Sequence, residues 1–175
     1  QTLYIGCSGT ANGAMKSTDG GLAWRDLLRG RSDLYNVNQI VVDPENTQNL
    51  YISAQESVLR SHNGGQEWAE ANSGLPRAQV SRVVLDRTQP RILYAVVQRK
   101  VYKSINVGKD WLPAGIGLPP DLTVLLCDPN LPDVLYAGTS HRGVYRTLNG
   151  GKNWVRFGSG LPSASISALA VDPQT

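Results

Sequence analysis

The sequence predicts an all-β protein that folds as a β-propeller of four-stranded antiparallel blades. Its four tryptophans recur every 43 or 44 residues, at positions 24, 68, 111 and 154. Short apolar runs alternate with Gly, Pro, Asn and Asp turn residues, and no stretch keeps an apolar period of 3.6 residues. A repeat of this length that holds four short strands has the size of a propeller blade.

Each repeat contains four expected strands in the same order, which the second repeat illustrates. The first strand is the apolar run 39–42, which ends at an Asp43-Pro44 turn. The second strand, 49–53, contains a Leu-Tyr pair, and the third, 57–61, leads into the motif that ends in tryptophan. The fourth strand starts at Trp68 and stops near Gly-Leu-Pro, because proline cannot donate to a strand ladder.

The expected strands at the two ends of the sequence are complementary. The sequence opens inside a second strand, at 3–6, and its last expected strand, 166–171, is a first strand. One blade is therefore expected to be split between the N- and C-terminal ends, which leaves no strand edge exposed. The expected blade repeats within a single domain, 1–175, are 1–36 with 164–175, 37–78, 79–121 and 122–163.

Three assemblies are compatible with a blade that is split between the two ends of the sequence. The ring closes within one chain to give four blades, or two chains share strands to give eight, or the chain is part of a longer propeller. A four-bladed ring of this blade type would be tight. We therefore expect a homo-oligomer in which two chains share strands to close a ring.

The composition is that of an ordinary soluble domain and argues against several kinds of partner. The 175 residues are 41% hydrophobic and 18% charged, and the longest apolar run, 122–127, is far below the roughly 20 residues of a membrane span. A net charge of +3 is too small to favour nucleic acid. Cys7 and Cys127 fit no metal-binding spacing, so we expect no metal and no cofactor.

We call the nine-residue motif that ends in each tryptophan a Trp phrase; the four phrases span 16–24, 60–68, 103–111 and 146–154. Each contains a basic residue, Ser or Thr, any residue, Asp or Asn, any residue, Gly, two free positions and Trp. This pattern resembles the Asp-box, or bacterial neuraminidase repeat, of sialidases, xyloglucan-cleaving glycoside hydrolases, sortilin-type receptors and photosystem II assembly factors. The resemblance implies a propeller but no single function, since these families share the motif and differ in activity.

The residues that match the motif are expected to be structural. Side-chain oxygens of Ser or Thr and of Asp or Asn can accept hydrogen bonds from nearby amides, and Gly supplies the positive φ of a tight turn. Three phrases carry Asn in place of Asp, which keeps the hydrogen bond and removes the charge, so a metal or acid–base role is not expected. For the same reason Asn106→Asp is expected to leave folding nearly unchanged. The matching residues are Ser17, Asp19, Gly21, Trp24, Ser61, Asn63, Gly65, Trp68, Ser104, Asn106, Gly108, Trp111, Thr147, Asn149, Gly151 and Trp154.

Antiparallel strand geometry predicts which end of the blades carries a ligand. The Trp phrases and the Asp-Pro turns share one end, so variable loops that could bind a ligand lie at the other. Basic residues outnumber acidic ones there, which favours an anionic ligand on a protein or a glycan. The ligand-binding candidates are Arg29, Arg31, Tyr35, Arg77, Arg99, His141 and Arg142.

Three functions are compatible with these residues. The first is a non-enzymatic propeller module that binds a protein or a glycan at this end. The second is a glycoside hydrolase, sialidase-like or β-glucan-cleaving, or a piece of one, with Asp33, Glu56 or Asp121 as acid or nucleophile. The Phe/Tyr-Arg-Ile-Pro motif of the sialidases that it resembles is absent. The third is a minimal or engineered half-propeller that assembles with itself.

Overall fold

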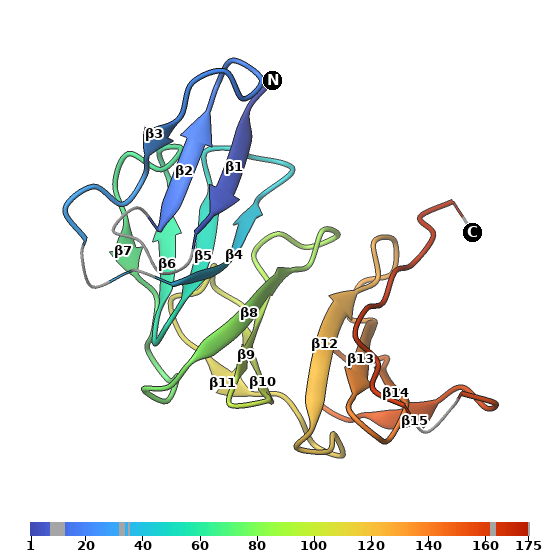
Figure 1. Cartoon of the computed structure of the whole chain (residues 1–175). Helices are drawn as coiled ribbons and strands as arrows, with labels where there is room; N and C mark the ends of the chain where they lie inside the picture. Colours follow the sequence, from blue (N-terminus) through green and yellow to red (C-terminus); the bar gives the residue numbers. More distant parts are fainter. Residues whose placement is uncertain (8–12, 32–33, 35, 162–163, 175) are drawn as a thin grey trace.

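The computed structural model describes residues 1–174 except 8–12, 32–33, 35 and 162–163. These residues form four antiparallel sheets that follow one another along an open arc, and no helix occurs among them (Figure 1). The expectation of an all-β propeller with four-stranded blades is therefore confirmed. Among the described residues there is accordingly no helix of the length and apolarity that a membrane span requires.

The first sheet has three strands and each of the others has four. The strands of the first two sheets are β1 (Leu3–Gly6), β2 (Ala14–Ser17), β3 (Arg25–Asp26), β4 (Val37–Val42), β5 (Leu50–Ala54), β6 (Val58–Ser61) and β7 (Ala69–Glu70). The strands of the third and fourth sheets are β8 (Val80–Leu85), β9 (Leu93–Val97), β10 (Lys100–Ser104), β11 (Leu112–Pro113), β12 (Leu122–Cys127), β13 (Leu135–Thr139), β14 (Val144–Thr147) and β15 (Val155–Phe157). Each sheet is a meander, in which strands consecutive in the sequence are hydrogen-bonded neighbours.

The register of the first two strands is the same in all three complete blades. The residue before the Asp turn pairs with the Leu of the Leu-Tyr pair, as Val42↔Leu50, Leu85↔Leu93 and Cys127↔Leu135. The aspartates that follow, Asp43, Asp86 and Asp128, are buried, and each accepts a hydrogen bond from the amide two residues later. A buried carboxylate needs such partners, so the Asp turn fixes both the end of one strand and the start of the next.

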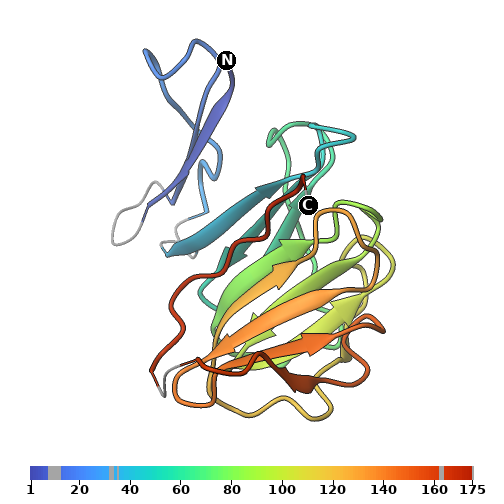
Figure 2. The ribbon, with the colours of Figure 1, turned by 90° about the vertical axis from the view of Figure 1, so that its right-hand side faces the viewer.

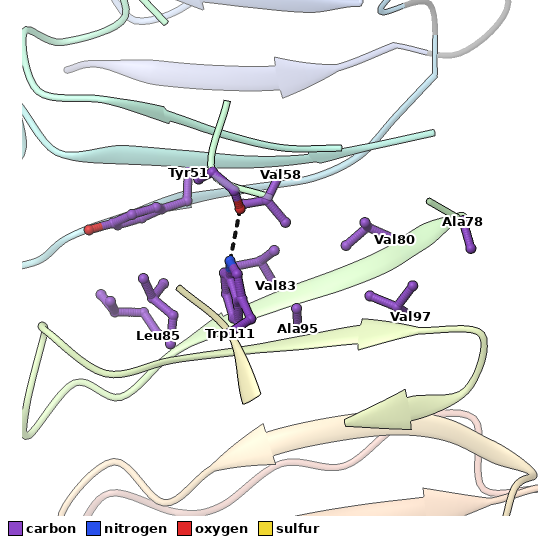
Figure 3. Packing of buried hydrophobic residues seen from close by; sticks show 11 residues of the cluster. Tyr51, Val58, Ala78, Val80, Val83, Leu85, Ala95, Val97 and Trp111 are labelled. Atoms are coloured by element: carbon purple, nitrogen blue, oxygen red, sulfur yellow. Dashed lines mark hydrogen bonds between the residues drawn. The ribbon is translucent and has the colours of Figure 1, made fainter. Parts of the chain in front are cut away.

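Neighbouring blades are joined by the tryptophans. The Trp111 indole lies between the second and third blades, is 1% exposed, and donates from Nε1 to the carbonyl of Ala71 at 2.8 Å (Figure 3). Around it pack apolar side chains from both blades, including Tyr51, Val58 and Val83. Trp154 makes the equivalent bond to Ala114 at 2.9 Å, and Trp68 makes it to Leu27 at 3.0 Å. The core is thus divided among the junctions between blades.

The segment expected to complete the split blade does not join it in this structure. Residues 164–174 contain no strand and run beside β12, whereas β1–β3 lie at the other end of the arc (Figures 1 and 2). The Ile166 amide donates to the carbonyl of Thr139 on β13 at 3.0 Å, and Asn130 Nδ2 donates to the carbonyl of Pro173 at 2.7 Å. The segment has no strand partner because the arc between it and β1 remains open.

Candidate functional site

The Trp phrases are held by one hydrogen-bond pattern that is repeated four times. The hydroxyl at the second position accepts from the amide of the phrase glycine, at 2.8 Å for Ser17 and 3.1 Å for Thr147. The side-chain oxygen of Asp19, Asn63, Asn106 or Asn149 accepts from the amide four residues later at 2.9–3.0 Å. These oxygens are engaged within the hairpin, which leaves them little capacity to act on a ligand.

Two of the asparagines also use their amide nitrogens. Asn106 Nδ2 donates to the carboxylate of Asp110 at 2.9 Å, and Asn63 Nδ2 donates to Glu67 at 3.1 Å. The hydrogen bond from Asn106 holds the pKa of Asp110 below its ordinary value of 3.8. The sequence-based expectation that Asn106→Asp is neutral overlooked this bond, because it depends on an acidic residue at a position that the motif leaves free.

Asn106→Asp is therefore expected to lower the midpoint of thermal unfolding slightly at pH 7, because it places two carboxylates against each other on an exposed hairpin. The depressed pKa of Asp110 contributes stability above its unfolded-state pKa, and this contribution is lost as the pH falls through the folded-state value. The deficit of the variant should consequently shrink below about pH 4, or when salt is added. Calorimetric scans from pH 7 to pH 3 would measure it.

Asn149→Asp is the matched control, since the residue four positions later is the uncharged Asn153 and not an aspartate. It should unfold at the temperature of the unchanged chain at every pH. Equal effects of the two substitutions would contradict the role given to Asp110.

The opposite end of the blades carries two adjoining cavities that share Gln55 and Glu56. We call them together the Gln55 groove. The larger has a volume of about 590 Å³ and is lined by Leu34, Gln55, Glu56, Ser57, Glu70, Asn72, Leu75, Pro76 and Arg77. The smaller has a volume of about 330 Å³ and is lined by Asn36, Asn38, Gln55, Glu56 and Gln79. Amide side chains are the commonest members of the smaller lining, where only Glu56 is of another type.

The polar groups of the groove are fixed by their neighbours. Asn72 accepts from the Val58 amide at 2.8 Å and donates from Nδ2 to the hydroxyl of Ser57 at 2.9 Å, which ties the β7 side to the hairpin between β5 and β6. Glu70 pairs with Arg31 at 3.6 Å. Gln55 lies at the start of the hairpin, and its side-chain oxygen Oε1 is buried without a hydrogen-bond partner. Other buried side-chain atoms, among them Asp121 Oδ1 and Ser53 Oγ, also have no hydrogen-bond partner in the described part of the chain, so Gln55 is distinguished by its place in the groove.

The structure brings together only some of the residues that the sequence singled out. Glu56 and Arg77 line the groove, and Arg31 joins it through Glu70. Two acidic side chains therefore accompany two basic ones, so this groove lacks the basic excess that would select an anion. Glu70 and Asn72 were not predicted, because the residues after Trp68 were assigned to a strand rather than to a loop.

The remaining candidates lie elsewhere. The Asp121 carbonyl accepts from the Ser140 amide at 3.0 Å, at the blade of β12–β15, and Asp121 lines neither cavity of the Gln55 groove. Arg99 borders a separate apolar cavity beside Tyr102 and Pro119. Arg29, His141 and Arg142 are exposed. Asp33 and Tyr35 lie outside the described residues. Asp121 and Glu56 are thus not paired in one cavity, as a glycosidase with that pair would require.

No metal site is apparent in the described part of the chain, where no group of three or more His, Cys, Asp or Glu side chains is close enough to hold an ion. Cys127 is buried, and burial raises the pKa of its thiol well above the ordinary value. A thiol in this state is a poor nucleophile and a poor metal ligand.

No protein-family model and no curated protein sequence matches this chain. Solved structures are similar in fold. The GH74 xyloglucanase from Xanthomonas campestris matches with a TM-score of 0.77 and 18% identity over 93% of this chain and 29% of the xyloglucanase. The GH74 enzyme from Niastella koreensis matches with a TM-score of 0.72 and 21% identity over 88% of this chain and 27% of the enzyme.

A structure of YCF48 bound to a D1 peptide also matches, with a TM-score of 0.53 and 17% identity over 68% of this chain and 38% of YCF48. All of these identities are below a quarter, so they show a shared fold and leave activity open. The chain spans less than a third of the GH74 structures. Its four sheets thus have the β-propeller architecture of these proteins.

Proposed function

We propose that this chain is a non-enzymatic propeller module that binds an extended peptide segment of another protein in the Gln55 groove. The observation that carries the proposal is the buried, unpaired Oε1 of Gln55. Such an oxygen costs free energy until a donor reaches it, and Gln55 is one of the two residues that line both cavities. A ligand N–H placed in the groove would supply the missing hydrogen bond.

The rest of the lining suits a peptide backbone. The amide side chain of Gln79 can both donate and accept, which matches the alternating N–H and C=O groups of an extended chain, and Asn38 beside it donates from Nδ2 to the Val80 carbonyl at 2.8 Å. Leu34, Leu75 and Pro76 offer apolar surface for side chains in the larger cavity. The balanced charges of Glu56, Glu70, Arg31 and Arg77 favour a polar ligand without large net charge. The peptide complex of the structurally similar YCF48 supports this choice of ligand class.

A glycoside hydrolase is the second candidate, because Glu56 and Glu70 line one cavity and the GH74 structures share the fold. Retaining and inverting enzymes both need two carboxyl groups on either side of a glycosidic bond. Against this, Glu70 is engaged in an ion pair with Arg31 at 3.6 Å, which competes with a role on a glycosidic bond. The binding module therefore remains the first choice.

A displayed library of random peptides, selected on the immobilised 175-residue chain, tests the proposal. The selected peptide should bind Gln55→Leu about ten-fold more weakly by calorimetry, since the leucine keeps the volume and removes the acceptor. Arg77→Ala should weaken binding as well. His141→Ala is the matched control on the same end of the blades, and it should leave the affinity unchanged because His141 lies outside the groove.

Two results would overturn the peptide proposal. Affinity that is indifferent to Gln55→Leu would place the peptide elsewhere on the chain. Release of sugar from xyloglucan or a sialyl reporter, abolished by Glu56→Gln and Glu70→Gln but retained in Asp121→Asn, would replace the binding module with the hydrolase.

A further inference from the structure

The Gln55 groove has a counterpart one blade further along the chain. A cavity of about 340 Å³, which we call the Arg99 cavity, lies on the blade of β8–β11 and the loop that follows it. Its lining includes Arg99, Lys100, Tyr102, Pro113, Ile116 and Pro120. The blades on either side, β4–β7 and β12–β15, both belong to this chain (Figure 1), so the cavity does not depend on the ends of the sequence.

The groove and the cavity are built on the same backbone positions. Pro113 pairs with β10 in the register in which Glu70 pairs with β6. The carbonyl of Ile116 accepts from the tryptophan amide of the next blade at 2.9 Å, as the carbonyl of Ser73 does. The two sites therefore differ in their side chains and not in their backbone.

The apolar side chains of the Arg99 cavity are not a requirement of the blade. Ile116 is 73% exposed, and the blades on either side have Ser73 and Ser159 at its position. Pro113 and Pro120 likewise stand where the preceding blade has a glutamate and an arginine. The bonds between blades use the backbone here, so they explain no preference for isoleucine. Clusters of exposed apolar side chains are typical of binding surfaces.

Basic side chains border the cavity at the hairpin between β9 and β10. Arg99 and Lys100 stand where the Gln55 groove has Glu56 and a serine, and none of the described residues that line the cavity is acidic. Gln98 and Arg99 have φ of +49° and +61°, in a hairpin turn for which Asn-Gly is a favoured sequence. The turn thus keeps an arginine where glycine would be less strained. This rim is complementary to a carboxylate.

A short hydrogen-bonded path connects the groove to the cavity. Asn72 lines the groove, and the carbonyl of Ser73, which follows it, accepts from the Trp111 amide. Pro113, two residues beyond Trp111, lines the cavity. Consecutive Cα atoms are about 3.8 Å apart, so Asn72 and Pro113 are separated by less than about 20 Å. An extended segment advances about 3.3 Å per residue, and about eight residues are enough to reach both sites.

We propose that the Arg99 cavity binds an apolar side chain of the same peptide that occupies the Gln55 groove, and that an acidic residue of the peptide lies beside it. This inference rests on the proposed function and specifies the chemistry of its ligand. The apolar side chain contacts Tyr102, Pro113 and Ile116, and the carboxylate lies against Arg99 and Lys100. An apolar cavity of about 150 Å³ holds benzene, so a cavity of about 340 Å³ accommodates a leucine or phenylalanine side chain.

Calorimetry with a peptide selected on the unchanged chain tests this second contact. Ile116→Ser should weaken binding about ten-fold through lost apolar burial, and it should fold as before because both neighbouring blades have serine there. Arg99→Gly should also weaken binding several-fold, and glycine is better suited than arginine to the positive φ. Ile105→Ser is the matched control, since Ile105 is 68% exposed in the Trp phrase of the same blade. It should leave the affinity unchanged.

A change in the peptide identifies the partner of Arg99. Replacement of the acidic residue by its amide should weaken binding to the unchanged chain several-fold. The same replacement should have little further effect on Arg99→Gly, because both changes remove one interaction. Full additivity of the two effects would contradict the contact between this carboxylate and Arg99.

The outcomes separate this inference from the proposed function. Affinity that falls with Gln55→Leu but not with Ile116→Ser or Arg99→Gly would overturn the inference and leave the proposed function intact. Affinity that falls with Ile116→Ser and Arg99→Gly but not with Gln55→Leu would support the Arg99 cavity and overturn the proposed groove. A solution mass above that of one chain, which Ile116→Ser reduces to one chain, would show that a second copy covers the cavity and would also overturn the inference.

Discussion

Trp111→Ala is expected to lower the free energy of unfolding by about 3–5 kcal/mol. The indole is 1% exposed, fills the space between two blades and donates to the carbonyl of Ala71 (Figure 3). Its removal leaves a cavity among packed side chains and a buried carbonyl without its donor, and both effects destabilise the folded state. Urea denaturation followed by circular dichroism would measure the change.

Leu112→Ala is the control for this prediction, since Leu112 follows Trp111 directly and is 71% exposed. Its effect should stay within about 0.5 kcal/mol, as is usual for surface substitutions. Comparable losses in the two variants would show that the strand β11, and not the buried indole, determines the effect.

Gly74→Ala should also be severely destabilising, by about 3 kcal/mol. Gly74 has a φ of +87°, and a Cβ atom at this position would collide with the backbone carbonyl oxygen of Trp111. This close approach exists because the Trp111 amide donates to the carbonyl of Ser73 at 2.9 Å, which draws the two backbones together. Relief of the collision would require the two blades to separate, so the cost exceeds that of the positive φ alone.

Gly30→Ala distinguishes the cost of the collision between blades from the cost of the positive φ. Gly30 follows Trp24 by the same six residues as Gly74 follows Trp68, and its φ of +82° is nearly the same, but within the described residues no atom beyond its chain neighbours lies within 4 Å of its Cβ position. Its substitution should cost only the backbone strain, about 1 kcal/mol. Thermal or urea unfolding of both variants gives the comparison. Equal losses would mean that φ, and not the contact between blades, decides the effect.

The blades could be predicted from the sequence because each repeated motif determines the backbone structure close to it in the chain. The Asp turn, the Leu-Tyr pair and the Trp phrase each fix a strand end or a strand register within about ten residues, and the structure reproduces that register in three blades. The contacts between blades were not visible in the same way. That Trp111 reaches Ala71, 40 residues earlier, follows from how the sheets stack.

The lining of the Gln55 groove could also be predicted only in part from the sequence. Strand direction alone placed Glu56 and Arg77 at one end of the blades, and both line the groove there. Glu70 and Asn72 also line it, although the sequence assigned them to a strand. The charge balance of the groove depends on Glu70, so the expectation of an anionic ligand depended on leaving strand residues out of the count.

The indole-to-carbonyl bond between neighbouring blades has a consequence for how such a chain can change its length. The three junctions between described blades use the same donor and the equivalent acceptor, so each joins one blade to the next along the chain. Duplication or loss of one 43-residue unit therefore regenerates a junction of the same kind at the new boundary. Blade number in such an architecture can vary by copying a unit, while the interior of each blade stays unaltered.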